Sequence, residues 1–166
     1  MFGKLPALGD FMSRGLDFAH RDALDHWLSG EMEAARTALG DGFDDRYFGA
    51  PAWFFVDRDP DGQWSGGALC ASVDAAGRKF PVMAAAPAKD VAEALALAGG
   101  CLDALHSAFA QGLDADGLQS LALAPGEVPW QADGPAWALV GEQGPAVVLP
   151  GRFPAGIVTT MMELAA

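Results

Sequence analysis

The sequence is poor in basic residues. It has 10 lysines and arginines against 22 aspartates and glutamates, which gives a formal net charge of −12. Such a surface repels the phosphate backbone of nucleic acids and the anionic headgroups of membranes. The composition therefore argues against nucleic-acid and membrane-surface roles, and it is compatible with a neutral or basic protein partner.

Long hydrophobic runs are also missing. The longest stretch without a charged residue, 62–73, is far shorter than the roughly 20 residues needed to span a bilayer. No apolar segment typical of a secretory signal follows Lys4, and Phe2 occupies the position where N-myristoylation requires glycine. We therefore expect a cytoplasmic protein without direct membrane insertion.

Residue patterns for catalysis are absent as well. The sequence contains no Gly-x-Ser-x-Gly, no His-Glu-x-x-His and no Cys/His cluster with the spacing of a zinc site. Its two cysteines, Cys70 and Cys101, lie in apolar segments, where we expect buried free thiols and no disulfide. The stretch 57–62 satisfies part of an EF-hand pattern, but Ala68 stands where the closing glutamate belongs, so we predict a hairpin turn. We predict no catalytic residue, no metal site and no cofactor.

What the sequence does contain is the pattern of one globular domain over residues 1–166, with 51% apolar residues. Periodicity and turn residues predict helices at 17–39, 90–110 and 154–164, the second with a capping box at Asp90 and Glu93. Strands are predicted at 52–57, 65–73, 80–86, 137–140 and 146–149. The order helix, three strands, helix, two strands, helix indicates an α+β fold, with helices packed on a mainly antiparallel sheet of about five strands.

Two segments are dense in glycine, proline and charged residues: GKLPALGDFMSRG at 3–15 and SVDAAGRKFPV at 72–82. The first is no phosphate loop, because Leu5 replaces the hydroxyl residue after the lysine and Pro6 lacks a backbone N–H. In the second, Asp74 can accept hydrogen bonds from a turn in which Gly77 takes the left-handed conformation.

We expect an ion pair between these segments or within the second one. An arginine in so acidic a chain is suited to holding a carboxylate, which favours Arg14 or Arg78 with Asp10 or Asp74. The opening segment would then contact the turn at 74–78 through Asp10 and Arg14. Whether this pairing only closes the fold or also faces a partner is left open by the sequence.

Together with DHWL at 25–28, these two segments resemble the TagF (ImpM) family of bacterial type VI secretion. The resemblance is clear over residues 2–87. Ala71 and Lys79 depart from the family pattern, in which proline and an aromatic residue are usual. The resemblance implies a non-enzymatic regulator, a post-translational repressor that acts through a scaffold protein with a forkhead-associated (FHA) domain.

The resemblance carries over no catalytic residue, and its motif residues become two sets of candidates. The hypothetical interaction patch consists of Lys4, Asp10, Arg14, Ser72, Asp74 and Arg78. The structural set consists of Gly3, Pro6, Gly9, Gly77, Phe80 and Pro81. Two alternatives remain open: a nucleotide- or phosphate-binding module or enzyme that uses Lys4, Arg14 and Arg78, and a structural subunit of the secretion apparatus.

Overall fold

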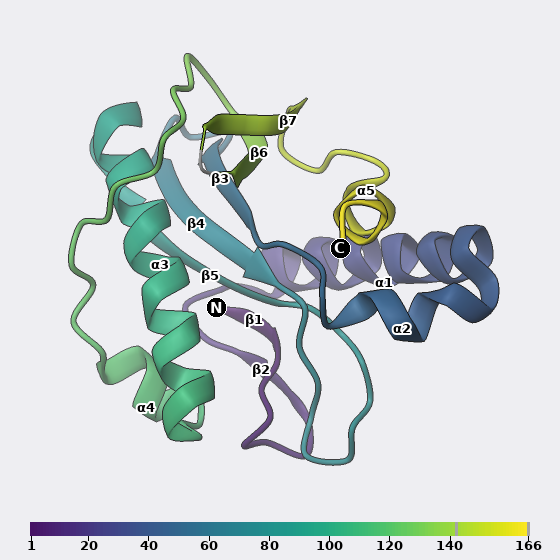
Figure 1. The fold of residues 1–166 in the computed structure, drawn as a ribbon. Coiled ribbons are helices and arrows are strands. Elements are labelled where there is room, and N and C mark those ends of the chain that lie inside the picture. The colour runs from purple at the N-terminus through teal and green to yellow at the C-terminus, as the bar shows by residue number, and fades with distance from the viewer. Residues whose placement is uncertain (142, 166) are drawn as a thin grey trace.

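A seven-stranded antiparallel sheet forms the centre of the structure, which is a computed structural model describing residues 1–141 and 143–165. The strands lie in the order β2-β1-β5-β4-β3-β6-β7 (Figure 1). Their bounds are β1 Phe2–Lys4, β2 Phe11–Ser13, β3 Trp53–Arg58, β4 Trp64–Cys70, β5 Val82–Ala88, β6 Ala136–Gly141 and β7 Gly144–Pro150.

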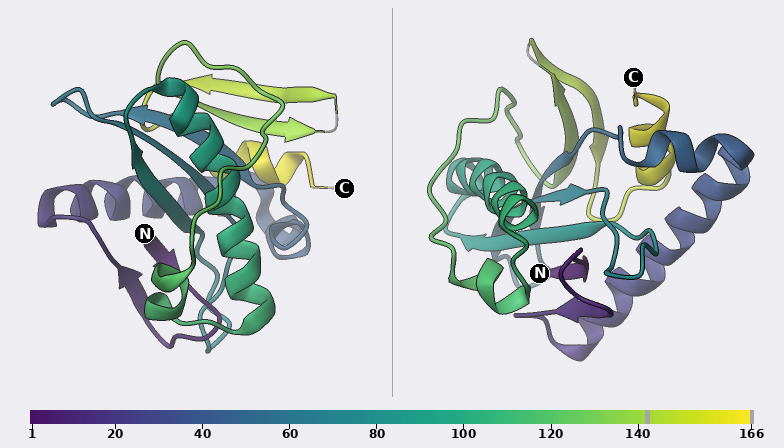
Figure 2. Two further views of the ribbon diagram at one scale, coloured as in Figure 1. Left: turned by 90° about the vertical axis from the view of Figure 1, so that its left-hand side faces the viewer. Right: turned by 60° about the horizontal axis from the view of Figure 1, so that its bottom comes forward.

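Helices cover both faces of this sheet (Figures 1 and 2). On one face, α3 packs across β4, β5 and β3, and α4 lies beside the C-terminal part of α3. On the other face, α1 and α5 pack against each other, with α2 adjoining both. The helix bounds are α1 Phe18–Leu39, α2 Phe43–Tyr47, α3 Val91–Gln111, α4 Ala115–Ser120 and α5 Ile157–Glu163, with a 3-10 turn, η1, at Gly40–Gly42.

The two long helices begin where the sequence predicts. Asp17 caps α1 by accepting a 2.8 Å hydrogen bond from the backbone N–H of His20. Asp90 caps α3 in the same way through Glu93, whose carboxylate in turn accepts from the backbone N–H of Lys89. These bonds satisfy N–H groups that have no partner in the first turn of a helix.

The predicted α+β class and antiparallel sheet are confirmed, but the expected strand number and order are wrong. The sheet has seven strands because the opening segment adds a hairpin, β1 and β2, ahead of the first helix. Each of these strands is only three residues long, too short to display the alternation that identifies a strand. The hairpin of β6 and β7 is present as predicted, although Glu142 in its turn lies outside the described residues.

Small residues allow α3 to lie close to the sheet. A Cβ atom added to Gly66 in β4 would lie 1.7 Å from the carbonyl oxygen of Ala94 in α3. Gly99 and Gly100, in the middle of α3, face the segment at 124–126 instead of the sheet. Gly66 therefore allows the close approach of α3 to the sheet, and Gly99 and Gly100 allow the close approach of the 124–126 segment to α3.

The C-terminal segment is held by three tryptophan side chains. The indole N–H of Trp27 in α1 donates to the carbonyl of Pro154 at 3.2 Å. Trp53 in β3 donates to Ile157 at 3.0 Å, and Trp137 in β6 donates to Arg152 at 3.0 Å. The connection from β7 to the start of α5 is thereby bound to the first helix and to two strands of the sheet.

Candidate functional site

The two motif segments lie side by side, as the sequence predicts. Phe2 and Gly3 in β1 pair with Met83 and Val82 in β5. Beyond the strands, the backbone N–H of Ala75 donates to the carbonyl of Leu8 at 2.7 Å. The opening segment is thus joined to the 72–82 segment both by sheet pairing and by loop contacts.

Asp74 is the centre of the contact, and its side chain is fully buried. One carboxylate oxygen accepts from the backbone N–H groups of Ala76 and Arg78, at 3.0 and 2.9 Å. The other lies 2.9 Å from Nζ of Lys4 and accepts from Nε of Arg78 at 2.6 Å. Burial by itself raises the pKa of Asp74, but the hydrogen bonds from Lys4 and Arg78 outweigh it and hold the pKa well below its usual range.

A second buried network surrounds Ser72. Its hydroxyl donates to the carbonyl of Lys4 at 2.7 Å. The hydroxyl of Tyr47 donates to the carbonyl of Ser72 and accepts from its backbone N–H, at 3.0 and 3.2 Å. Burial raises the pKa of the Tyr47 phenol far above its usual value. Sequence reasoning missed Tyr47, and the one available signal was that it is the only tyrosine in the chain.

The structural set has mostly clear roles. Gly3 has a φ of +125°, and a Cβ there would lie 2.1 Å from the carbonyl oxygen of Pro81. Gly77 has a φ of +78° in the turn that surrounds Asp74. Gly9, in contrast, has open space around it and no positive φ, so its contribution is the carbonyl that accepts from Arg78 at 2.7 Å.

Pro6 and Phe80 belong to the same set. Pro6 follows Leu5 in a turn closed by the N–H of Leu8, which donates to the carbonyl of Leu5 at 2.9 Å. The ring of Phe80 is buried and lies edge-on to Phe11, with 4.7 Å between the ring centroids. Phe80 thus packs the opening hairpin against the body of the protein, whereas Pro6 is exposed and shapes the local turn.

The predicted contacts of the exposed motif residues are only partly correct. Arg78 pairs with Asp74 as expected, but Asp10 and Arg14 do not contact the turn at 74–78 through their side chains. Arg14 instead lies 3.3 Å from Asp116 in α4, and Asp10 accepts a 3.2 Å hydrogen bond from the backbone N–H of Phe11. The sequence contained no pattern that placed α4 beside the end of β2, so this pairing was not predictable from it.

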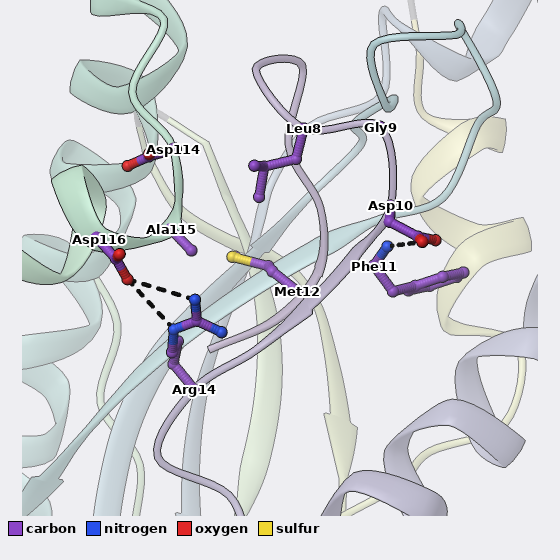
Figure 3. A pocket seen from close by; sticks show the side chains of 9 residues that line it. All are labelled: Leu8, Gly9, Asp10, Phe11, Met12, Arg14, Asp114, Ala115 and Asp116. Carbon is purple, nitrogen blue, oxygen red and sulfur yellow. Dashed lines mark hydrogen bonds and ion pairs between the residues drawn. The ribbon is translucent and has the colours of Figure 1, made fainter.

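Asp10 and Arg14 line an open groove between β2 and α4, which we call the β2–α4 groove (Figure 3). It has a volume of about 530 Å³ and is lined by Leu8, Gly9, Asp10, Phe11, Met12, Arg14, Asp114, Ala115 and Asp116. Figure 3 shows Met12 directed toward Ala115 while Phe11 points to the other side of the strand. The six residues of the hypothetical patch are therefore divided, because Lys4, Ser72 and Asp74 are buried and Asp10, Arg14 and Arg78 are exposed.

Neither a metal-binding cluster nor a reactive cysteine is found among the described residues. Among residues 1–141 and 143–165, no three histidine, cysteine, aspartate or glutamate side chains are placed to hold a metal ion. Burial raises the pKa of the Cys70 thiol to about 12 and that of Cys101 to about 11, so neither is a ready nucleophile. Within the same residues, the helices are all too short or too polar to cross a membrane.

Comparison with known proteins assigns the family. The chain resembles a crystal structure of PA0076 from Pseudomonas aeruginosa PAO1, with a TM-score of 0.59 and 24% sequence identity over 99% of this chain and 76% of that one. Comparison with curated proteins gives no match. The family model of the TagF N-terminal domain, described as type VI secretion system-associated, matches residues 1–123. The chain therefore belongs to the TagF family of type VI secretion system-associated proteins.

Proposed function

We propose that this protein is a non-enzymatic, cytoplasmic regulator of type VI secretion that represses the apparatus post-translationally by binding an FHA-domain scaffold protein. Family membership supports the process, and the scaffold partner follows from the resemblance of the two motif segments. One observation supports the binding role. The exposed patch residues Asp10 and Arg14 line the β2–α4 groove, and Arg78 lies exposed on the neighbouring turn.

The division of the motif residues favours a protein partner over a small anionic ligand. Lys4 is buried and bound to Asp74, so it is not available to a nucleotide or phosphate. Arg78 shares the same carboxylate, and Arg14 faces Asp116. The exposed arginines thus lie among carboxylates, which lower the attraction for an anion.

Binding to the scaffold can be tested by co-purification with purified full-length proteins. We expect the wild-type chain to retain the scaffold, and Asp10→Ala and Arg14→Ala to weaken retention. Arg46→Ala, which removes an exposed arginine of α2 outside the groove, is the matched control and should bind like wild type. Failure of the wild-type chain to retain the scaffold would reject this partner.

The two alternatives give different results. A nucleotide- or phosphate-binding module would be stabilised by its ligand in a thermal-shift screen, since a ligand that binds only the folded state raises its stability. A structural subunit would co-purify with the assembled apparatus in fixed stoichiometry. Under our proposal neither occurs, and raising the amount of the protein in cells lowers type VI-dependent export.

A further inference from the structure

β2 is an edge strand with a free side. Among the described residues it pairs only with β1, and it ends the sheet. Met1 and Arg14 exchange backbone hydrogen bonds at 2.8 and 3.0 Å, next to the Phe2–Ser13 pair. Because hydrogen-bonded and non-hydrogen-bonded pairs alternate along an antiparallel ladder, the backbone groups of Ser13 and Phe11 point away from β1.

Only neighbouring side chains contact these outward groups among the described residues. Asp10 accepts from the N–H of Phe11 at 3.2 Å, and Nη1 of Arg14 donates to the carbonyl of Ser13 at 3.1 Å. Both side chains are exposed, so a partner can displace them at low cost. Asp10 and Arg14 therefore act as temporary caps on an otherwise open sheet edge.

Hollows lie on both sides of this edge. The β2–α4 groove is on the side of Met12, and a second one, the β2–α1 groove, is on the side of Phe11. The second has a volume of about 310 Å³ and is lined by Phe2, Phe11, Met12, Ser13, Arg21, Asp22 and Asp25. A strand added to β2 would point successive side chains alternately into the two grooves, which is the geometry of peptide recognition by β-strand addition.

The charged side chains around the β2 edge favour a basic partner segment. The two grooves together contain five aspartates, at positions 10, 22, 25, 114 and 116, and two arginines, at positions 14 and 21. This leaves an excess of three negative charges around a strand that itself exposes the ring of Phe11. A basic side chain in either groove would meet a carboxylate, and an apolar one beside Phe11 would cover its exposed ring.

From this geometry we infer that β2 is the docking edge for an extended, basic segment of a partner protein, which adds as an eighth strand. The inference rests on the proposed function, because it gives the partner's mode of recognition at the same site. Asp10 and Arg14 release the edge when the segment binds, and the carboxylate of Asp10 then contacts its basic side chains.

A direct test uses a blocked peptide of alternating lysine and valine, about nine residues long so that it covers β2. Addition of this peptide to the full chain should slow hydrogen exchange of the Ser13 and Phe11 amides. A peptide of alternating glutamate and valine is the charge control and should have no effect. Slower exchange spread evenly over amides of the acidic surface, without protection of the Ser13 amide, would show non-specific attraction and overturn the inference.

Proline variants show which of the two sheet edges binds the peptide. Ser13→Pro removes an outward N–H and leaves the bonds to β1, a change that edge strands tolerate. Val148→Pro does the same on β7, the opposite edge, where Val148 is exposed. We expect Ser13→Pro to weaken peptide binding at least about tenfold, the effect of one to two lost hydrogen bonds, and Val148→Pro to leave it unchanged. Equal binding by both variants would overturn the inference.

The same variants tell apart failure of the inference and failure of the proposed function. If the wild-type chain retains the FHA-domain scaffold and Ser13→Pro does so equally well, the partner is correct and the edge is not its site. If the wild-type chain does not retain the scaffold, the partner is wrong, while amide protection by the basic peptide still tests the edge by itself.

Discussion

The ammonium group of Lys4 lies 2.9 Å from the carboxylate of Asp74, and both side chains are buried. This ion pair connects the opening hairpin to the 72–82 turn, two segments that are far apart in the sequence. Removal of Asp74 would leave the buried ammonium of Lys4 without compensation, and removal of Lys4 would take away one of the two cations that bind the Asp74 carboxylate. The pair is therefore a structural element, although residue type alone suggested an interaction surface.

Replacement of Lys4 by methionine should destabilise the protein strongly. Lys89→Met is the matched control, because Lys89 is exposed. The folded-state pKa of Asp74 is depressed, so its stabilisation is present above the ordinary value of 3.8 and is lost as the pH falls below it. Urea unfolding at several pH values should show this acid loss in wild type and a smaller one in Lys4→Met, in which Arg78 and two backbone N–H groups still bind the carboxylate. Equal acid dependence of the two proteins would contradict the prediction.

Ionisation of Tyr47 should be coupled to unfolding. Burial raises the pKa of its phenol above the ordinary value of 10.0, so stability is unaffected below that pH and is lost as the pH rises beyond it. Because this is the only tyrosine, the phenolate absorbance near 295 nm reports on it alone. We expect the absorbance change to coincide with loss of near-ultraviolet circular dichroism. Titration near pH 10 in a folded protein would contradict this result.

Both thiols should be protected in the folded state. Cys70 and Cys101 are buried, and their raised pKa values leave little thiolate at pH 8. A thiol reagent at that pH should react slowly with native protein and rapidly with both cysteines in denaturant. Fast reaction of either thiol before unfolding would show that its surroundings open locally.

Two glycine-to-alanine substitutions should act in opposite directions. Gly66→Ala places a methyl group against the backbone of α3 and should lower the free energy of unfolding by about 3 kcal/mol. Gly30→Ala, at an exposed position of α1 with open space around it, should raise it by about 0.5–1 kcal/mol. Urea denaturation measures both, and a stable Gly66→Ala variant would mean that α3 can move away from β4.

The part of the chain beyond the family match should be needed for folding. Residues 124–165 supply β6, β7 and α5, and three tryptophans bind the connection between the last two and the first residue of α5. We propose that the chain folds as one unit, so a 1–123 fragment should lack a cooperative unfolding transition. Cooperative thermal unfolding of that fragment would show that the first part is a domain by itself.

The sequence alone determined the local structure that depends on short-range patterns. Helical periodicity placed α1, periodicity with the capping box at Asp90 placed α3, and turn residues placed the strands from β3 to β7, because these signals involve neighbours along the chain. The motif segments also carried the resemblance to the family that the family model confirms. The pairing of Arg78 with Asp74 was predictable because the two residues flank one short turn, which brings their side chains within reach of each other.

The tertiary structure decided which motif residues are available to a partner. Lys4, Ser72 and Asp74 became buried because their polar groups satisfy one another and Tyr47, whereas Asp10 and Arg14 stayed on a sheet edge next to α4. Neither fact follows from residue type or spacing, since burial and edge position depend on how the elements pack. Sequence defined the motif, and packing separated its structural half from the half that faces solvent.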